Sequence, residues 1–419
     1  MKKLLIISFF LISVPNLLFA QTFSGGTGTE ADPYLISNIA DIEELTNLVN
    51  VGYASGSGNW SYGKYFRVTQ DITDGVKIPI GRVIFSSNLN GAFSGYFDGD
   101  NHKITLEIEI NTGLILGGLF GITRDATIIN TIVDGYVRCN SLVGEHMAGV
   151  VGHSIDCLIK NCINYANITI IGATGAAGIV GRATDVTIED CINAGTIEVY
   201  GVGNIYSPAS VSGIVDMLNL GSFKSTIKNC LNIGDILNKV SIKSYCRTSG
   251  IVAYAVNADI INCINSGFIY AEVGNEPQSG VGGILGSVYS GATLNATISN
   301  CINTGVIEGN ANVGAIAGSI ISDGNITITN CHYDKQFCVY KGVNGVDVPG
   351  VSGHITRNMV GRKLANLLGD TDWTYVEGAT LIECLYPQLK VFSESPDEKR
   401  TDASKVGATP IFLYDGIKD

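Results

Sequence analysis

Proline and charged residues are both scarce in this chain. Only 9 of its 419 residues are proline, and only 15% are charged. A collagen-like chain needs abundant proline with glycine at every third position, and a disordered chain is rich in charge and poor in apolar residues, so both classes are excluded. Basic residues are also in the minority, 26 against 38 acidic residues, for a net charge of −12. Binding to nucleic acid or to an anionic membrane needs clustered lysine and arginine, so neither partner is expected.

Glycine, by contrast, is abundant. The chain has 52 glycines, and 45% of it is hydrophobic. This much glycine argues against a helical bundle, because glycine destabilises helices. Together with the many isoleucine, valine, threonine and asparagine residues, it predicts short strands joined by many tight turns.

The first 20 residues have the composition of a secretory signal peptide. Lys2 and Lys3 precede an apolar run that ends near Ala20 and is too short for a membrane span. We expect residues 1–20 to be removed, and the mature protein to be secreted or held at the cell surface without a membrane span.

Two short sequence elements alternate through most of the chain. The first consists of a small residue, a glycine, two apolar residues and usually a second small residue, and its glycines are Gly118, Gly149, Gly178, Gly213, Gly250, Gly283 and Gly314. The second is close to Asn-Cys-Ile-Asn, and its cysteines are Cys162, Cys191, Cys230, Cys263, Cys301 and Cys331. The spacing from the glycine to the second element is constant in most repeats, and additional residues fall at two places per repeat, which must be loops.

This repeat predicts a β-solenoid rather than a helical array. Stretches such as residues 186–199 are rich in β-branched residues, and their apolar residues recur at short, alternating spacing. Each repeat would form one coil of a few short strands, with glycine and asparagine at the bends. We predict an all-β fold, a parallel right-handed β-helix of about seven coils, one for each motif glycine.

The repeats resemble the GLUG motif of secreted bacterial proteins, among them Bacteroidetes surface proteins and immunoglobulin-A-cleaving metallopeptidases. Residues 118–121, Gly-Leu-Phe-Gly, match the motif literally, and the lead-in at residues 26–36 and 93–104 is also similar. The resemblance covers about residues 24–390. It implies a β-solenoid with a surface or adhesive role and no defined chemistry. The peptidase relatives carry their zinc site elsewhere, and the sequence has no His-Glu-x-x-His, so their proteolytic activity does not carry over.

Both ends of a solenoid need caps, because they expose unpaired backbone and apolar side chains. An amphipathic helix is predicted at about residues 39–51, with Ser37 or Asn38 as its N-cap, and a second helix at residues 357–368. The predicted units are a signal peptide (1–20), an N-terminal cap with lead-in strands (21–116), the repeat solenoid (117–334), a C-terminal cap (335–392) and a linker followed by a strand-like terminal segment (393–419).

The cysteines of the second element occupy one repeat position, so stacked coils would place them in a single column. We interpret this column as a ladder of buried thiols, because free cysteine behaves as a small hydrophobe. A metal strip is disfavoured because the chain has no Cys-x-x-Cys pair, and sulfur geometry disfavours disulfides along a straight stack. If any pair forms a disulfide, we expect it to be Cys331 and Cys338.

Asparagines flank the column cysteines on both sides. We expect them to be bend residues whose amides hydrogen-bond along the stack, and the alternative is an amide strip that binds sugar hydroxyls. The preceding residues are Asn161, Asn229, Asn262, Asn300 and Asn330, with Asp190 as the exception, and the following ones are Asn164, Asn193, Asn232, Asn265 and Asn303.

Two other polar clusters are assigned to structure. Asp98, Asp100 and Glu109 have the spacing of three calcium-loop positions, with His102 at the next. Lys103 stands where such a loop requires glycine, so we predict a tight turn instead. The run of residues 332–335, His-Tyr-Asp-Lys, lies where the repeat ends, and we assign it to the transition into the cap.

An enzymatic role is the principal alternative. A glycosidase needs two carboxylates at separations of about 5–9 Å. The acidic residues of the repeats instead scatter over the pattern, at Asp134, Asp156, Glu189, Asp216, Asp259 and Asp323. We therefore predict no catalytic residues, no metal and no cofactor. A β-helix polysaccharide lyase or glycoside hydrolase stays open as an alternative, as does a passive stalk for a missing domain.

The most useful functional signal is geometric. Three consecutive repeats carry the longest loops, at residues 201–211, 238–248 and 271–281, and equivalent loops of a solenoid emerge on the same side. The resulting patch has aromatic, amide and positively charged side chains: Tyr206, Lys239, Lys243, Tyr245, Arg247, Asn275, Glu276 and Gln278. Such a surface suits a glycan or an extracellular protein, so we predict a non-catalytic binding or adhesion module. The competing interpretation is that these loops merely tolerate insertions.

Overall fold

A computed structural model describes most of the chain after its N-terminal segment. The described residues are 23–55, 59–82, 91–111, 116–140, 146–172, 175–202, 209–219, 221–241, 245–272, 278–289, 295–310, 312–321, 325–378, 380 and 383–410. The expected signal peptide at residues 1–20 lies outside them. No helix in the described ranges is long and apolar enough to cross a membrane.

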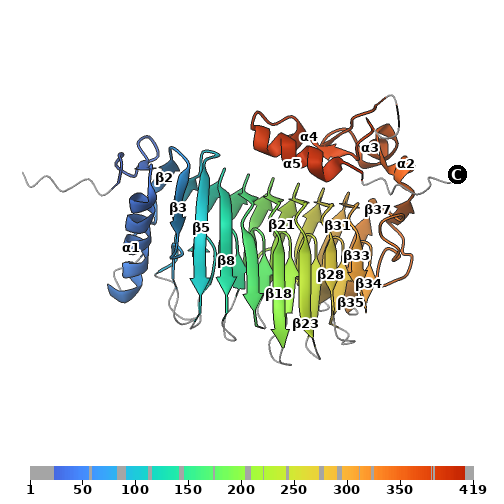
Figure 1. Ribbon diagram of the computed structural model, residues 1–419, viewed down its shortest axis with the longest axis horizontal. Helices are drawn as coiled ribbons and strands as arrows, with labels where there is room; N and C mark the ends of the chain where they lie inside the picture. Colours follow the sequence, from blue (N-terminus) through green and yellow to red (C-terminus); the bar gives the residue numbers. More distant parts are fainter. Residues whose placement is uncertain are drawn as a thin grey trace, which may run out of the picture.

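The protein is a long parallel β-solenoid, which confirms the predicted all-β β-helix (Figure 1). From β6 onward the coils visit four sheets in the same order, and neighbouring strands within each sheet run parallel. Sheet 1 contains β1 (Tyr34–Ile36), β2 (Tyr65–Val68), β4 (Tyr96–Asp98), β7 (Thr127–Ile129), β11 (Leu158–Lys160), β16 (Thr187–Glu189), β21 (Ser225–Lys228), β26 (Ala258–Ile261), β31 (Asn295–Ser299) and β36 (Asn325–Thr329). Sheet 2 contains β6 (Phe120–Arg124), β10 (Val151–Ile155), β15 (Val180–Thr184), β20 (Val215–Leu218), β25 (Val252–Ala255), β30 (Leu285–Tyr289) and β35 (Ala317–Ile321).

The other two sheets complete the coil. Sheet 3 contains β3 (Ile72–Val76), β5 (Lys103–Ile110), β8 (Ile132–Cys139), β12 (Ile163–Asn164), β13 (Asn167–Ile171), β17 (Ile192–Asn193), β18 (Ile197–Val202), β22 (Leu231–Asn232), β23 (Ile236–Ser241), β27 (Ile264–Asn265), β28 (Ile269–Ala271), β32 (Ile302–Asn303), β33 (Ile307–Gly309), β37 (Cys331–Asp334) and β38 (Val351–His354). Sheet 4 contains β9 (His146–Ala148), β14 (Gly175–Ala177), β19 (Ala209–Ser212), β24 (Cys246–Ser249), β29 (Gly280–Gly282) and β34 (Val313–Gly314).

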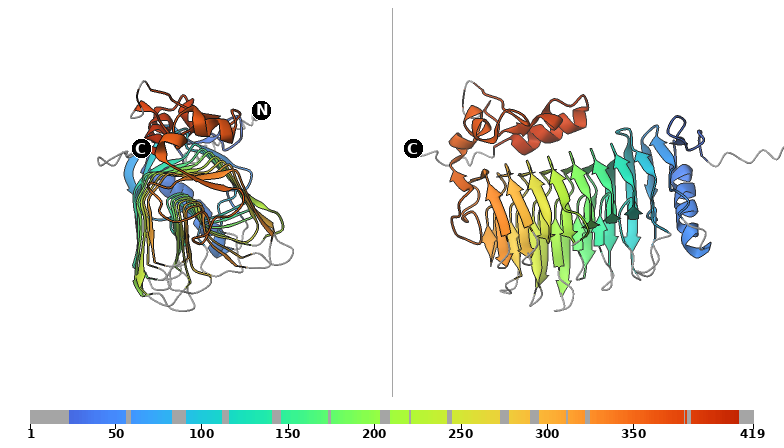
Figure 2. Two further views of the ribbon diagram at one scale, coloured as in Figure 1. Left: turned by 90° about the vertical axis from the view of Figure 1, so that its right-hand side faces the viewer. Right: turned by 180° about the vertical axis from the view of Figure 1, so that it is seen from behind.

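Sheet 4 is an inner layer of the coil. Its strand β19 contacts β23 of sheet 3 on one side and β20 of sheet 2 on the other, and the end-on view in Figure 2 shows this middle layer between two walls. Every residue of β14, β19 and β24 is buried. The small residues of the first sequence element allow sheets 2 and 4 to approach closely, because a Cβ at Gly318 on β35 would lie 2.3 Å from the backbone nitrogen of Val281 on β29.

The bend between sheets 1 and 3 has a left-handed backbone at the residue before each column cysteine and before Thr131, which holds the equivalent position in an earlier coil. The φ angles lie between 48° and 59° at Asn130, Asn161, Asp190, Asn229, Asn262, Asn300 and Asn330. Asparagine and aspartate tolerate this conformation better than other residues with a side chain. Their predicted role as bend residues is therefore confirmed.

The asparagines that follow the column cysteines form a continuous buried ladder. The Nδ2 of Asn232 donates to Oδ1 of Asn265, and the Nδ2 of Asn265 donates to Oδ1 of Asn303, each at 2.8 Å. Each Nδ2 also donates to a backbone carbonyl two residues later, at 3.2 Å from Asn265 to Gly267. The predicted pairing of amides along the stack is confirmed, and these amides lie in the interior rather than on a sugar-binding surface.

This ladder explains the glycine of the first sequence element. A Cβ at Gly250 would lie 2.2 Å from Oδ1 and 2.3 Å from Cγ of Asn265, distances at which atoms cannot coexist. The glycines equivalent to Gly250 face their own ladder asparagines in the same way at Gly149, Gly178, Gly213 and Gly283. The two sequence elements are therefore two halves of one interlocking unit.

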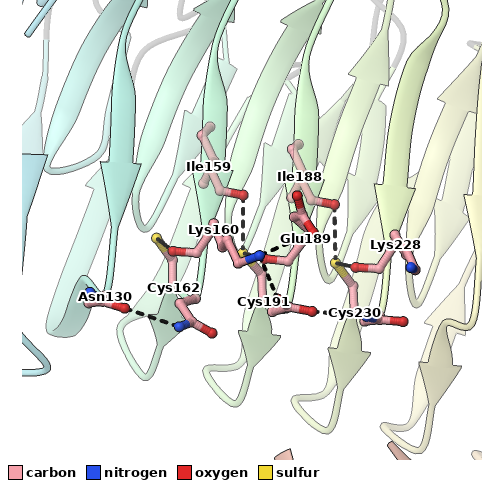
Figure 3. Close-up of polar contacts among 12 residues, drawn as sticks. Asn130, Ile159, Lys160, Cys162, Ile188, Glu189, Cys191, Lys228 and Cys230 are labelled. Carbon is pink, nitrogen blue, oxygen red and sulfur yellow. Dashed lines mark hydrogen bonds and ion pairs between the residues drawn. The ribbon is translucent and has the colours of Figure 1, made fainter. Parts of the chain in front are cut away.

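The column cysteines are fully buried and stack in one line, as predicted (Figure 3). The thiol of Cys191 donates to the carbonyl of Glu189 at 3.2 Å and to that of Ile159 in the preceding coil at 3.8 Å. Burial raises the pKa of the Cys162, Cys230 and Cys301 thiols. The disulfide considered for Cys331 and Cys338 is wrong, because both are free and Cys338 instead packs in the end cap.

Native protein should therefore resist thiol reagents. Cys384 is the one free cysteine that is not buried, so a Cys384→Ser variant should react at least about a hundredfold more slowly when folded than in denaturant, since reaction requires opening of the stack. The rate of colour release from an aromatic disulfide reagent measures this. Fast labelling of the folded Cys384→Ser variant would place the column outside the interior.

The N-terminal end is closed by α1 (Ile39–Ser55), the predicted capping helix extended by a few residues (Figure 1). Asn38 is its N-cap, since Oδ1 of Asn38 accepts from the backbone N–H groups of Ala40 and Asp41. The lead-in strands are more than a cap. Strands β1, β2 and β4 belong to the same ten-stranded sheet as the repeats, so stacking begins well before residue 117.

The C-terminal region differs from the prediction. Residues 335–354 close the end of the stem, with Cys338 and Val343 in the main core. The remaining elements are α2 (Thr356–Met359), α3 (Arg362–Leu368), the antiparallel pair β39 (Trp373–Thr374) and β40 (Gln388–Leu389), α4 (Lys390–Ser393) and α5 (Glu398–Ala408). They turn back along the flank of the solenoid (Figure 1). They form a second core on the row Ile132, Ile163, Ile192, Leu231, Ile264 and Ile302.

The linker predicted at the start of residues 393–419 is wrong, because residues 398–408 form α5. Asp397 caps this helix by accepting from the N–H of Lys399 at 3.0 Å. Arg400 is 2% exposed and donates to backbone carbonyls of Asn161 and Asp190 on two successive coils. The polar composition of the segment thus reflects bonds to the bend carbonyls and not solvation. Residues 411–419 lie outside the described residues.

Candidate functional site

The strands that flank the three long loops pair in register. Strands β18, β23 and β28 are neighbours in sheet 3, and β19, β24 and β29 are neighbours in sheet 4. The loops between them therefore leave and re-enter the stem at adjacent positions. Figure 1 shows that β18 and β23 end on the side of the stem opposite the C-terminal helices.

The residues of the predicted patch differ in their exposure, and some of them are not described by the structure. Tyr206, Lys243, Asn275 and Glu276 lie outside the described residues. Lys239 is exposed, with its ammonium 5.0 Å from the ring centroid of Tyr200 and 3.9 Å from a carboxylate oxygen of Glu198. Tyr245 and Gln278 are half-buried at the starts of their re-entering segments.

Arg247 lies in the interior, whereas the sequence prediction placed it in a surface patch. It is 5% exposed, its guanidinium stacks 3.9 Å from the ring centroid of Tyr254, and Nη2 donates to Oε1 of Gln278 at 3.1 Å. Arg247 lies on β24 and Tyr254 on the adjoining β25, so the arginine points into the seam between sheets 4 and 2.

A buried acid–imidazole pair lies in the same seam. Asp216 on β20 is fully buried, and its Oδ2 lies 2.6 Å from Nδ1 of His146 on β9. The side chain of His146 is 13% exposed. Burial raises the pKa of Asp216, whereas His146, Arg247 and Arg182 act in the opposite direction. The carboxylate is thus held among cationic or ionisable groups from several coils.

Gly175 makes room for this pair. A Cβ at Gly175 would lie 1.7 Å from Oδ2 of Asp216 and 2.6 Å from Nδ1 of His146. Gly175 pairs in register with His146, so the carboxylate of Asp216 crosses the intervening strand to reach the imidazole. Any larger residue at position 175 would therefore displace the carboxylate of Asp216 from His146.

Two more groups lie on neighbouring strands of sheet 2. His153 and Arg182 are register partners on β10 and β15, and both are half-buried. The Asn219 side-chain oxygen accepts from Nε and Nη2 of Arg182 in the amide orientation that satisfies both groups. We refer to His146, His153, Arg182, Asp216 and Arg247 together as the seam cluster.

The seam cluster was missed at the sequence level, although Asp216 carries a signal. It is the last residue of one copy of the first element, where the other copies have Gly121, Gly152, Gly181, Ala253, Gly286 and Gly318. The prediction treated Asp216 as one of several scattered acids. When the repeats are compared position by position, Asp216 stands out as the one acidic residue where the other copies have glycine or alanine.

His153 should make the protein less stable in mild acid. Burial, with Arg182 and His146, lowers the pKa of His153 to about 3, whereas the unfolded residue titrates near its ordinary value of 6.5. Between these pH values the unfolded chain binds the additional proton, so stability falls as the pH drops through 6.5 toward 3. The loss from His153 is about 2 kcal/mol at pH 5. Denaturant titration of wild type and His153→Gln at pH 7 and pH 5 measures it, and an equal drop in both proteins would contradict the assignment.

The other predicted clusters are structural. Asp98 accepts from the N–H of Asp100 and from the amide of Asn130, both at 2.9 Å, within the predicted tight turn. Asp100 has a φ of 47° and Glu109 pairs with Arg138 at 3.6 Å. Residues 332–335 lie at the cap transition as expected.

A cavity of about 480 Å³ separates the stem from the C-terminal segment. Its lining includes Phe268, Phe337 and Tyr386. The polar groups around it join the two parts, since Ser266 donates to the carbonyl of Gly407 at 2.6 Å and Tyr386 donates to Asp334 at 2.7 Å. We therefore interpret this cavity as part of the seam that holds the C-terminal segment in place.

Comparisons with known proteins add little. No protein-family model and no curated protein matches this sequence. A crystal structure from Bacteroides ovatus, provisionally assigned as an immunoglobulin A1 protease, is similar with a TM-score of 0.45 and 20% identity, over 88% of this chain and 96% of that chain. A likeness of this size says nothing about activity.

Proposed function

We propose that this protein is an exported, non-catalytic β-solenoid that binds glycans or extracellular proteins at the side of the stem where its long loops emerge. The observation that carries the proposal is the pairing of β18 with β23 and β28, and of β19 with β24 and β29, which puts the strand ends that bound three long loops side by side. Binding residues concentrate on loops that a rigid scaffold positions.

The distribution of unusual residues supports the same side. Most repeat positions are committed to stacking, through the asparagine ladder, the thiol column and the close-packed glycines. Lys239, Tyr245 and Arg247 are not required by the repeat, and they lie on or beside the strands that enter and leave the loops. The resemblance of the repeats to the GLUG motif, together with the signal-like N-terminus, supports a secreted or surface location.

A binding screen tests the proposal. The chain from residue 23 onward is screened against glycan and matrix-protein arrays, and affinities for the hits are measured by calorimetry. A Lys239→Ala, Tyr245→Ala double variant should lose at least about tenfold in affinity, since it removes a charge and an aromatic surface without touching the core.

The matched control carries the same two changes far from the loops. Tyr62 is 70% exposed and Lys363 is also exposed, so Tyr62→Ala with Lys363→Ala should bind as the wild type does. Equal affinity of the loop variant and the control would reject the loop side as the binding surface. No binding to any array component would reject the proposed function.

A further inference from the structure

The cavity between the stem and the C-terminal segment has a partly exposed apolar lining. Phe268, Val306 and Phe337 are half-buried along it, and Val406 on α5 is 63% exposed. Large apolar side chains that stay partly exposed around one hollow indicate a place that another apolar group covers. A benzene ring fits a cavity of about 150 Å³. The volume of about 480 Å³ therefore has room for more than one large side chain.

The outer face of the stem becomes apolar beneath this cavity. Ile168, Ile197, Ile236, Ile269 and Ile307 are register partners in sheet 3. The residues that precede them therefore share one repeat position, and in coil order they are Asn167, Thr196, Asp235, Phe268 and Val306. None of these five is buried, so the position lies on the outside of the sheet.

Stacking of the coils does not require an apolar residue at this position. The first three of these coils carry a polar residue there and pack in the same sheet. Asp235 lies at the cavity as well, and the change to apolar side chains occurs in the next two coils, at Phe268 and Val306. Two apolar side chains on an otherwise polar outer row favour an apolar partner at this part of the stem.

The end of α5 is fixed at the edge of the same cavity. Ser266 of the stem donates to the carbonyl of Gly407 at 2.6 Å, and the N–H of Tyr386 donates to the carbonyl of Ala408 at 2.8 Å. Gly407 and Thr409 both line the cavity, and Pro410 follows them. The chain after Pro410 therefore starts beside the cavity.

The next four residues are all large and apolar. Residues 411–414 read Ile-Phe-Leu-Tyr. Full burial of one such side chain contributes about 1.5–3 kcal/mol, so a run of four favours a covered position. Four extended residues reach at most about 13 Å, which is enough to enter a cavity that begins at Thr409.

We propose that residues 411–414 lie in this cavity and pack on Phe268, Val306 and Phe337. The run then covers the apolar part of the outer face and fastens the end of the C-terminal segment to the flank of the stem. A separate apolar ligand would leave the run itself uncovered. The run is also held beside the cavity at a high effective concentration, because it is joined to Thr409 through one residue. This inference goes beyond the proposed function and does not depend on what the loops bind.

Thiol labelling of the full chain tests this inference. In the Cys384→Ser background, Phe412→Cys and Leu413→Cys each add one thiol to the run, on opposite sides of an extended segment. Lys405→Cys is the matched control, because Lys405 is exposed on α5. At least one of the two thiols in the run should react at least about tenfold more slowly than the control thiol.

Phe268→Asp distinguishes docking in this cavity from burial elsewhere. It installs the residue type that Asp235 provides one coil earlier, and Val306→Asp makes the same change one coil later. In either variant the slow thiol should react about as fast as the control thiol. Asn167→Asp changes the same repeat position away from the cavity and should leave the thiol slow.

Two outcomes would overturn the inference. The first is reaction of both thiols of the run as fast as the control thiol when the cavity is unchanged. The second is slow labelling that persists in both Phe268→Asp and Val306→Asp, because the run would then be buried elsewhere. Circular dichroism of each variant shows that the stem is folded during labelling.

Discussion

Replacing Asn265 with alanine is expected to lower the free energy of unfolding by about 3 kcal/mol or more. Asn265 is fully buried in the middle of the ladder, where it accepts from Asn232 and donates to Asn303 at 2.8 Å. Its loss leaves Oδ1 of Asn303 and the carbonyl of Gly267 without that donor, and it also opens a cavity. Urea titration followed by circular dichroism measures the change.

Asn111 provides the matched control. It is exposed and accepts one hydrogen bond from Asn140 at 3.0 Å, so Asn111→Ala should change stability by no more than about 0.5 kcal/mol. Similar small effects at both positions would mean that the buried ladder does not stabilise the stem.

Gly250→Ala should be about as damaging, with a loss of about 3 kcal/mol. The new Cβ would overlap Oδ1, Cγ and Cβ of Asn265, all within 2.6 Å. The asparagine has no free space to enter, because its amide is fixed to the coils above and below. The same denaturation experiment measures this loss.

Gly63→Ala separates the steric effect from the backbone effect. Gly63 has a φ of 69°, and a Cβ there would meet nothing within 4 Å. Only the left-handed backbone penalty of about 1 kcal/mol applies at this position. A loss at Gly250 no larger than that at Gly63 would show that the glycine and the asparagine are not in contact.

Much of the fold is readable from the sequence because a solenoid repeats its contacts. The position of Asn265 in Asn-Cys-Ile-Asn recurs in successive repeats. The need for a buried asparagine at this position is therefore visible several times in the sequence. The end segments lack this redundancy. Helix α5 was mistaken for a linker because Arg400 is satisfied by carbonyls of coils more than two hundred residues earlier, which no local pattern reveals.

The candidate site was readable only in part. The alignment of the long loops follows from the repeat spacing, and the pairing of β18 with β23 agrees with it. The burial of Arg247 and the contact of Asp216 with His146 depend on sheet 4 turning inward between two other sheets. No single residue of the repeat predicts that sheet 4 turns inward. Asp216 is the one sequence sign of it, because its carboxylate contacts His146 of that sheet.

A double-mutant cycle between Gly250→Ala and Asn265→Ala tests most directly the claim that the two sequence elements form one interlocking unit. Removal of the Asn265 amide takes away the two atoms nearest to the new Cβ, at 2.2 Å and 2.3 Å. The double variant should therefore lose at least about 1 kcal/mol less stability than the sum of the single losses. Additive losses would show that the glycine of the first element and the asparagine of the second do not interact. They would also contradict the view that the residues of the repeat serve to stack the coils.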